Sequence, residues 1–147
     1  PSNVFGRIIT PAFNRWNLVP GCFCKEALET GTITIRSSGK QVRNFVHLEN
    51  ICRGVDSILN HFPADFEVFN LASSLYLTMK EVAESVKKVF ETEFQKPIEI
   101  LIEGQDPVST NFFNIDLSRL QSLGFTEDNR FTLETEIKEI INFLNKK

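Results

Sequence analysis

Two hydrophobic spacings alternate along the chain, and each predicts a type of element. Apolar residues three and four positions apart share one face of an α-helix, whereas strict alternation places them on one face of a strand. The first spacing predicts helices around residues 23–28, over 49–62, after 78, over 116–124 and over 133–144. The second spacing, together with short apolar runs, predicts strands at residues 3–6, 32–35, 43–48, 68–71 and 98–102.

The ends of these elements carry local signals. Gly31 is expected to end the first helix, because a glycine tolerates the positive φ that a helix end requires. Thr78 and Glu81 have the spacing of a capping box, which starts the third helix. Residues 37–39 (Ser-Ser-Gly) turn the chain, so strands 32–35 and 43–48 could form a small hairpin-like unit.

Helices that alternate with short strands indicate an α/β fold. The strands are too few and too short for a complete doubly wound sheet. We therefore expect a lobe that completes a larger fold. The first residues read as the end of a strand and follow Pro1 rather than a methionine, as expected for a cut inside a larger protein.

Composition narrows the class of protein. The chain has 147 residues, of which 41% are hydrophobic and 24% charged, with a net charge of −3. It lacks a run of Lys and Arg, which argues against nucleic-acid binding. It also lacks the ~20 consecutive apolar residues of a membrane span, and a signal peptide. Three cysteines, an odd count, argue against a disulfide framework and favour reduced thiols in the cytoplasm.

Arg43 is the leading candidate for a binding residue. A guanidinium holds phosphate oxygens through two parallel hydrogen bonds, and an ordered strand would fix its direction. The alternative is an exposed edge arginine that keeps the strand soluble. Asn3 could bind a ligand through its amide, or it could cap a local turn before Gly6.

The sequence gives little support for catalytic residues, a dinucleotide site or a metal site. His47 is expected to pack in a core or interface, and His61 sits at a helix end. Tyr76 and Lys80 have the spacing of the short-chain dehydrogenase Tyr-x-x-x-Lys signature, but Thr78 starts a helix between them, so the two side chains need not meet. A glycine-rich dinucleotide turn, a Ser-His-Asp arrangement and a metal cluster are all missing from the sequence.

Several segments, in order, resemble motifs of the extended short-chain dehydrogenases that act on nucleotide sugars, the NAD-dependent epimerases and dehydratases. Residues 3–6 (Asn-Val-Phe-Gly) resemble Asn-hydrophobic-Tyr/Phe-Gly-Pro, and 17–20 (Asn-Leu-Val-Pro) resemble Asn-Leu-Ile/Met-Pro. Residues 39–47 resemble Gly-x-x-x-Arg-Asp-Phe-Val-His. Later segments resemble Tyr-Asn-Leu-Gly, Ala-Asp-x-Ser-Lys and Leu-Gly-Trp, at 68–72, 115–119 and 123–125. The resemblance covers essentially the whole chain.

This resemblance implies the C-terminal substrate-binding lobe of an extended Rossmann-type dehydrogenase, with most of the NAD-binding sheet missing. Residues 1–147 would form that lobe, and the N-terminal NAD-binding domain would be absent. The expected ligand is a nucleotide-diphosphate sugar. The motifs assign the diphosphate to Asn3 and Arg43, the nucleotide to Asn17 and Leu18, the base to Thr34 and Arg36, and a substrate-facing position to Phe113.

One departure from the family concerns phosphate binding. The family's Arg-x-Gly-Asp segment aligns with residues 102–106 (Ile-Glu-Gly-Gln-Asp), where the arginine is missing and a carboxylate would repel phosphate. Either Arg36 or an arginine outside this chain compensates, or substrate handling differs.

The family's NAD(P)-binding turn and catalytic Tyr-x-x-x-Lys pair lie upstream of the Asn-hydrophobic-Tyr/Phe-Gly segment, so they would precede Pro1. We therefore expect the parent protein to be the NAD-dependent epimerase or dehydratase, and this chain alone to bind no NAD and to be inactive. Two alternatives remain: an NAD(P)-dependent reductase of the same superfamily, and a non-catalytic ligand-binding or regulatory lobe. The resemblance does not determine which sugar and which base the ligand contains. It also leaves open whether the parent protein is a homodimer.

Overall fold

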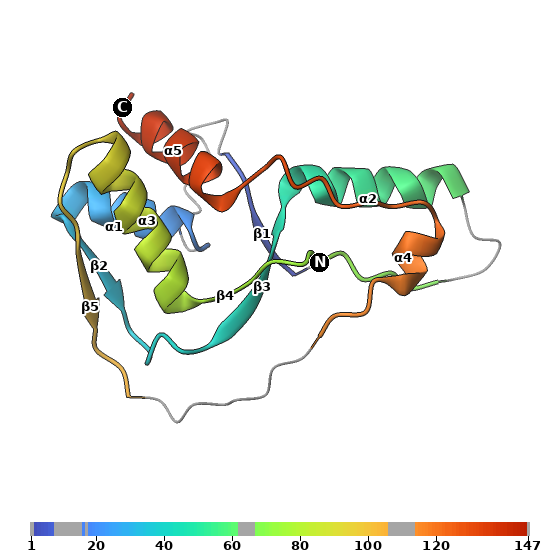
Figure 1. The fold of residues 1–147 in the computed structure, drawn as a ribbon, viewed down its shortest axis with the longest axis horizontal. Coiled ribbons are helices and arrows are strands. Elements are labelled where there is room, and N and C mark those ends of the chain that lie inside the picture. The colour runs from blue at the N-terminus through green and yellow to red at the C-terminus, as the bar shows by residue number, and fades with distance from the viewer. Residues whose placement is uncertain (1, 8–15, 17, 62–66, 106–113, 147) are drawn as a thin grey trace.

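The computed structural model describes residues 2–7, 16, 18–61, 67–105 and 114–146. Its helices and strands alternate as an α/β fold, which confirms the class predicted from the sequence (Figure 1). The helices are α1 (Gly21–Thr30), α2 (Leu48–His61), α3 (Met79–Glu93), α4 (Ser118–Ser122) and α5 (Leu133–Leu144). The strands are β1 (Asn3–Phe5), β2 (Thr32–Ile35), β3 (Val42–His47), β4 (Tyr76–Thr78) and β5 (Glu99–Ile102).

The strands of the described residues form two small sheets. The larger has the order β1-β3-β4, with β1 parallel and β4 antiparallel to β3. The smaller pairs β2 with β5 in parallel. The expected hairpin of 32–35 with 43–48 is therefore wrong. The turn after β2 leads the chain away to the other sheet, and β2 finds its partner more than sixty residues later.

Helices α1, α3 and α5 gather with β2 and β5 at one end of the molecule, and α2 and α4 lie at the other end (Figure 1). The β1-β3-β4 sheet runs between the two groups. The main core lies in the three-helix group, where the apolar faces of α3 and α5 meet. Its most buried members include Ile33, Val82, Val86, Phe90, Ile137 and Ile141.

Helix ends follow the local signals in the sequence. Gly31 ends α1 with φ of 76°, and its backbone N–H donates to the Ala27 carbonyl. Thr78 and Glu81 form both halves of the capping box at the start of α3. In that box the Glu81 backbone N–H donates to the Thr78 hydroxyl at 3.1 Å, and the Thr78 backbone N–H donates to the Glu81 carboxylate at 2.7 Å.

Helix α2 presents an apolar stripe to solvent, although its periodicity predicts a buried one. Val55 is 42% and Leu59 58% exposed, whereas Asn50 and Gly54 are buried. A Cβ at Gly54 would lie 2.4 Å from the Leu71 Cδ2 atom, so a larger residue here would require the Leu71 side chain to move. The helix therefore buries Asn50 and Gly54 most completely, whereas Ile51 and Ile58 are half-buried.

The strand expected at residues 68–71 is also wrong, because these residues have no ladder partner in the described part of the chain. The Leu71 carbonyl accepts a hydrogen bond from the Ser2 backbone N–H at 2.9 Å, which is a single contact rather than a ladder. The other expected strands and helices are present, with ends that differ by one to a few residues.

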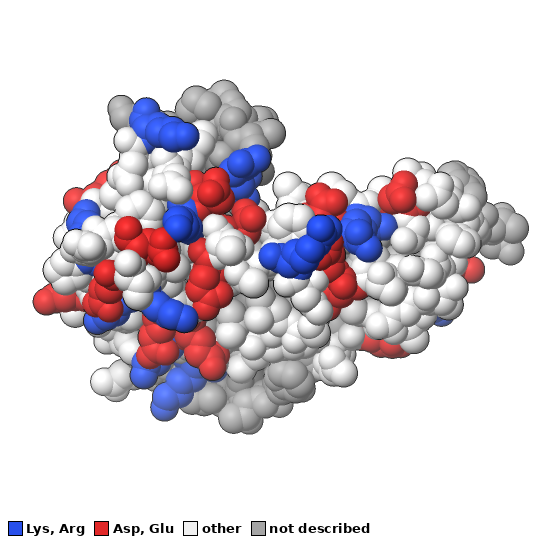
Figure 2. All heavy atoms as spheres, turned by 45° about the horizontal axis from the view of Figure 1, so that its top comes forward, with Lys and Arg blue, Asp and Glu red and all other residues white. Residues whose placement is uncertain are grey.

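The molecular surface mixes charges. Figure 2 shows acidic and basic side chains interspersed over this face, with no extended area of one sign. No helix in the described segments has the length and apolar character needed to cross a membrane.

Candidate functional site

A cavity of about 600 Å³ opens at the β1-β3 edge of the larger sheet. Four separate segments contribute its walls, and their residues are far apart in sequence. The lining residues are Ser2, Asn3, Arg43, Asn44, Asn70, Leu71, Asn114, Ile115 and Asp116. The cavity therefore exists only because the fold brings these four segments together.

Arg43 and Asn3 line this cavity together. The parallel register pairs Asn3 with Phe45, two residues along β3 from Arg43. Both side chains are exposed. The Arg43 Nη2 atom donates to the Gln41 side-chain oxygen at 3.2 Å, and the described residues provide it with no carboxylate ion pair. Its positive charge is thus not neutralised by a described acidic side chain.

The other lining segments of the cavity, which contain Asn70 and residues 114–116, are held by hydrogen bonds. The Tyr76 hydroxyl donates to the Asn114 side-chain oxygen at 3.2 Å and accepts from the Ile115 backbone N–H at 3.0 Å. The Asn70 side-chain amide donates to the Asp116 carbonyl at 3.0 Å. These contacts fix residues 114–116 relative to β4 and to the segment before it.

Asp116 brings a negative charge to the cavity wall. Its carboxylate accepts hydrogen bonds from the Ser118 backbone N–H at 2.8 Å and from the Ser118 hydroxyl at 3.1 Å. These bonds favour the ionised form and lower the pKa of Asp116, with a smaller effect from Arg119. The cavity lining therefore includes both a cationic residue, Arg43, and an anionic residue, Asp116.

The other residues assigned by motif do not line this cavity. Leu18 is 64% exposed near the start of α1, Thr34 lies on β2, and Arg36 follows β2 as an exposed side chain. The β2-β5 sheet that carries the last two is separate from the sheet that carries Arg43. Their assigned roles stay predictions. Asn17 and Phe113 lie outside the described residues.

Seven lining residues lie outside the site predicted from the sequence: Ser2, Asn44, Asn70, Leu71, Asn114, Ile115 and Asp116. Isolated asparagines carry no sequence signal of a site, because the same residue type is common in turns. The sequence predicts a helix from Asp116 and places this residue in the segment 115–119 that resembles a family motif. Its carboxylate accepts from the Ser118 backbone N–H at the start of α4, and Asp116 lines the cavity as well.

Tyr76 and Lys80 do not form a catalytic pair in the structure. Tyr76 lies on β4 and contacts Asn114 and Ile115, whereas Lys80 is in α3 with its Nζ atom 3.7 Å from the Glu84 carboxylate. Tyr76 thus lies outside the helix that contains Lys80, and the interpretation of their spacing as a coincidence stays a prediction. His47 packs in the interior, as expected, with its ring stacked on Phe131 at a centroid distance of 4.4 Å.

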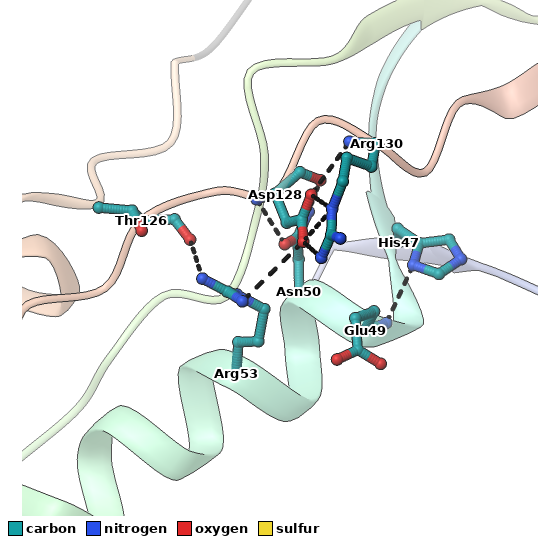
Figure 3. Close-up of polar contacts among 7 residues, drawn as sticks. All are labelled: His47, Glu49, Asn50, Arg53, Thr126, Asp128 and Arg130. Atoms are coloured by element: carbon teal, nitrogen blue, oxygen red, sulfur yellow. Dashed lines mark hydrogen bonds and ion pairs between the residues drawn. The ribbon is translucent and has the colours of Figure 1, made fainter.

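A second polar cluster joins the start of α2 to residues 126–130 (Figure 3). Arg130 donates to both carboxylate oxygens of Asp128, at 3.0 and 2.6 Å, and this pairing lowers the pKa of Asp128 to about 2. Arg53 approaches the same carboxylate at 3.9 Å and donates to the Thr126 carbonyl at 3.5 Å. All these groups are paired with one another, so the cluster has a structural role and connects two segments of the chain. We call Arg53, Thr126, Asp128 and Arg130 the clasp.

The described residues contain no group of His, Cys, Asp and Glu side chains that could hold a metal ion. A glycine-rich turn between a parallel strand and a helix, as a dinucleotide needs, is also missing from them. Helix α2 follows β3 directly, and Glu49 in its first turn would repel a phosphate. The described residues thus do not fit NAD.

Comparison with known proteins identifies relatives that act on nucleotide sugars. No family model matches the chain. A UDP-sulfoquinovose synthase of Sulfolobus acidocaldarius is 28% identical over 130 residues, which cover 83% of this chain and 32% of that protein. The chain thus spans about a third of that curated relative.

Solved structures share the fold over 99% of this chain. One is a dTDP-glucose 4,6-dehydratase of Bacillus anthracis in complex with NAD, with a TM-score of 0.70 and 22% identity. Another is a UDP-glucuronic acid 4-epimerase of Bacillus cereus in complex with UDP-glucuronic acid and NAD, with a TM-score of 0.72 and 17% identity. The match covers 43% of each of these chains, so the described fold corresponds to less than half of either protein.

Proposed function

We propose that the chain belongs to the extended short-chain dehydrogenase/reductase family of NAD-dependent nucleotide-sugar epimerases and dehydratases, and that it forms the nucleotide-sugar-binding part of such an enzyme. The proposal places residues 1–147 in the C-terminal substrate-binding domain. Its ligand is a nucleotide-diphosphate sugar, and the diphosphate lies against Arg43 and Asn3.

The observation that carries the proposal is the shared cavity of Arg43 and Asn3. Separate sequence motifs, forty residues apart, assign the two residues to one diphosphate, and both residues line the same cavity. A guanidinium without a described carboxylate partner is available for bidentate contact with phosphate oxygens. The volume of about 600 Å³ lies within the usual range for small-molecule sites.

The charges of the cavity orient the ligand. Asp116 would repel a phosphate, so we place the diphosphate against Arg43 and away from Asp116. Sugar hydroxyl groups both donate and accept hydrogen bonds. They suit the wall formed by Asn70, Asn114 and Asp116, which offers amide donors together with amide and carboxylate acceptors.

Chemistry on the sugar is not assigned to this chain. Relatives of this fold are solved with NAD bound. The described residues do not fit that cofactor, so we derive no reaction step here. Within the proposal, this chain binds and orients the nucleotide sugar, and the cofactor-binding residues belong to another part of the enzyme.

A second candidate function is a ligand-binding lobe without a catalytic role. The segment that aligns with the family's Arg-x-Gly-Asp motif favours it, since Ile102 and Glu103 stand where the family has its additional phosphate-binding arginine. Glu103 is exposed, and its backbone N–H donates to the Ile35 carbonyl at 3.0 Å. A carboxylate at this place lowers the affinity expected for a diphosphate.

The test is binding of UDP-glucose and dTDP-glucose to the chain by ligand-observed NMR, which detects weak complexes. Arg43→Ala should weaken binding by about 1.5–3 kcal/mol, the value of a charged hydrogen bond. Arg43→Lys should recover only part of the loss, because an ammonium group cannot form the bidentate contact.

Arg7→Ala is the matched control. Arg7 is also an exposed arginine beside β1, but it lies 3.8 Å from Glu139 and lines a different cavity. Its replacement should leave affinity unchanged. An Arg43→Ala chain that binds as tightly as the wild type would remove Arg43 from the proposed site.

A further inference from the structure

The outward face of α2 carries a stripe of exposed apolar side chains. Leu48, Cys52, Val55 and Leu59 follow one another at spacings of four, three and four residues, so they lie along one face of the helix. All four are exposed, and Leu59 is the most exposed of the three large ones at 58%. Figure 1 shows α2 at the edge of the molecule, away from the three-helix group. We call these four residues the outer stripe.

The outer stripe continues the apolar interior onto the surface. With about 3.6 residues per turn, the half-buried Ile51 and Ile58 border it on one side, and the exposed Glu49, Asp56 and Asn60 border it on the other. Apolar side chains thus extend from the buried face of α2 up to a polar boundary. A contiguous apolar surface with a polar rim is typical of a face that another protein segment covers.

Strand β1 adjoins the outer stripe. Gly6 follows β1, and a Cβ at Gly6 would lie 3.1 Å from the Leu48 Cβ atom. Gly6, Leu48 and Cys52 also line one cavity of about 400 Å³. Among the described residues β1 pairs only with β3, so its other edge is open. The end of this open strand and the start of the outer stripe are therefore neighbours on the surface.

The β1-β3 pair has the features of a sheet that is incomplete in the described part of the chain. Its two strands are parallel, and parallel strands occur almost only in sheets that have both faces covered. On the far side of β3 the next strand is β4, which is antiparallel. Further parallel strands can therefore be added only beside β1.

The occupant of this surface follows from the size of the matched structures. The match covers 43% of the dehydratase and of the epimerase, so more than half of each chain is additional protein. Both are complexes with NAD, and the described residues of this chain do not fit NAD. Within the proposed function, the additional part is thus the one that binds NAD, and it is large enough to supply strands and a covering layer.

We propose that the outer stripe and the open edge of β1 together form a docking surface, and that the NAD-binding part of the enzyme occupies it. This inference rests on the proposed function and identifies the surface by which the two parts join. A strand of the NAD-binding part continues the sheet beside β1, and apolar side chains of the same part cover the outer stripe. A second copy of this chain fits less well, because a two-fold axis would pair β1 antiparallel with itself over only three residues.

Cys52 makes the docking measurable, because its thiol lies within the outer stripe. The rate of its alkylation by N-ethylmaleimide is measured by peptide mass spectrometry in the complete enzyme and in residues 1–147 alone. We expect Cys52 to react at least about tenfold more slowly in the complete enzyme, since docking buries the outer stripe. Amide hydrogen exchange of residues 3–5 should slow as well, because the open edge of β1 gains a partner strand. Cys24, which is 0% exposed, should stay unreactive in both forms and shows that each is folded.

Leu59→Arg opposes docking, because covering the outer stripe would then bury an unpaired charge. In the complete enzyme this variant should react at Cys52 at least about tenfold faster than wild type. In residues 1–147 alone the rate should be unchanged, because position 59 is exposed there. The comparison of variants within the complete enzyme also holds if residues 1–147 do not fold alone.

Leu101→Arg is the matched control. Leu101 is 49% exposed and lies on β5, in the other sheet and at the end of the molecule opposite α2 (Figure 1). The substitution is the same, but its site is outside the docking surface. It should leave the Cys52 rate of the complete enzyme unchanged.

The outcomes separate this inference from the proposed function. A complete enzyme that binds NAD and UDP-glucose, but in which Cys52 reacts as fast as in residues 1–147, would overturn the docking surface alone. Equal acceleration by Leu59→Arg and Leu101→Arg would also overturn it, because the effect would not depend on the outer stripe. Residues 1–147 that sediment as a dimer with Cys52 protected would overturn the choice of occupant in favour of a second copy. A complete protein that binds neither NAD nor a nucleotide sugar would overturn the proposed function, and the identity of the occupant with it.

Discussion

Asn50 and Asp128 hold each other through two opposed hydrogen bonds, although 78 residues separate them in the sequence. The Asn50 side-chain amide donates to the Asp128 carbonyl at 3.2 Å, and its oxygen accepts from the Asp128 backbone N–H at 2.9 Å. Asn50 lies at the start of α2, directly after β3 (Figure 3). One side chain thus ties the chain segment before α5 to the end of the strand that carries Arg43.

The first prediction concerns this contact. Asn50→Ala removes both hydrogen bonds and leaves the Asp128 N–H and carbonyl without their partner. Because Asn50 is 3% exposed, we expect a loss of about 2 kcal/mol in the free energy of unfolding, measured by urea denaturation.

Asn60→Ala tests whether this loss is specific. Asn60 lies on the same helix but is exposed, and it makes one hydrogen bond to Asp56 at 3.1 Å. Its replacement should change the free energy of unfolding by less than about 0.5 kcal/mol. Equal losses in the two variants would show that the Asn50–Asp128 contact contributes nothing of its own.

The second prediction concerns the acid stability of the clasp. The hydrogen bonds from Arg130 lower the pKa of Asp128 to about 2 in the folded chain, below the ~3.9 of an unfolded aspartate. A folded-state pKa that is depressed gives stability above the unfolded value, and this stability is lost as the pH falls towards 2. Asp128 should therefore contribute to acid unfolding between about pH 4 and pH 2.

The measurement is an NMR titration of the Asp128 carboxyl group together with acid unfolding curves. Arg130→Gln should move the pKa of Asp128 up towards its ordinary value, and the variant should lose less stability below pH 4 than wild type does. Arg53 remains in this variant, 3.9 Å from the carboxylate, so some depression of the pKa should persist. A titration unchanged by Arg130→Gln would rule out Arg130 as the cause.

The third prediction concerns the apolar stripe of α2. Val55 and Leu59 are 42% and 58% exposed, so Val55→Gln and Leu59→Gln should each change the free energy of unfolding by less than about 0.5 kcal/mol. Glutamine is a good helix former, which keeps the backbone cost small.

Ile137→Ala provides the contrast for this experiment. Ile137 is 0% exposed in the core on α5, and its truncation should cost about 2–5 kcal/mol. A loss above about 1.5 kcal/mol for Leu59→Gln, close to the core value, would show that the stripe of α2 is buried in solution.

Local elements of the fold follow from nearby residues, and the sequence predicts them well. The capping box of Thr78 and Glu81, the end of α1 at Gly31 and the buried stripe of α5 each depend on contacts within one or two helical turns. Which face of α2 is buried does not follow from nearby residues. Periodicity shows that one face is apolar, but whether that face is covered depends on segments that lie elsewhere in the chain.

The sequence by itself determined the α/β class, the helix ends and two diphosphate candidates, Asn3 and Arg43, because these depend on short patterns and on motifs. Only the tertiary structure decided that β2 pairs with β5 and not with β3, since strand pairing across long loops is set by the packing of the whole core. It also decided that Asn44 and Asp116 share a cavity with Arg43, because residues distant in sequence become neighbours only when the sheet and the loops around it have formed.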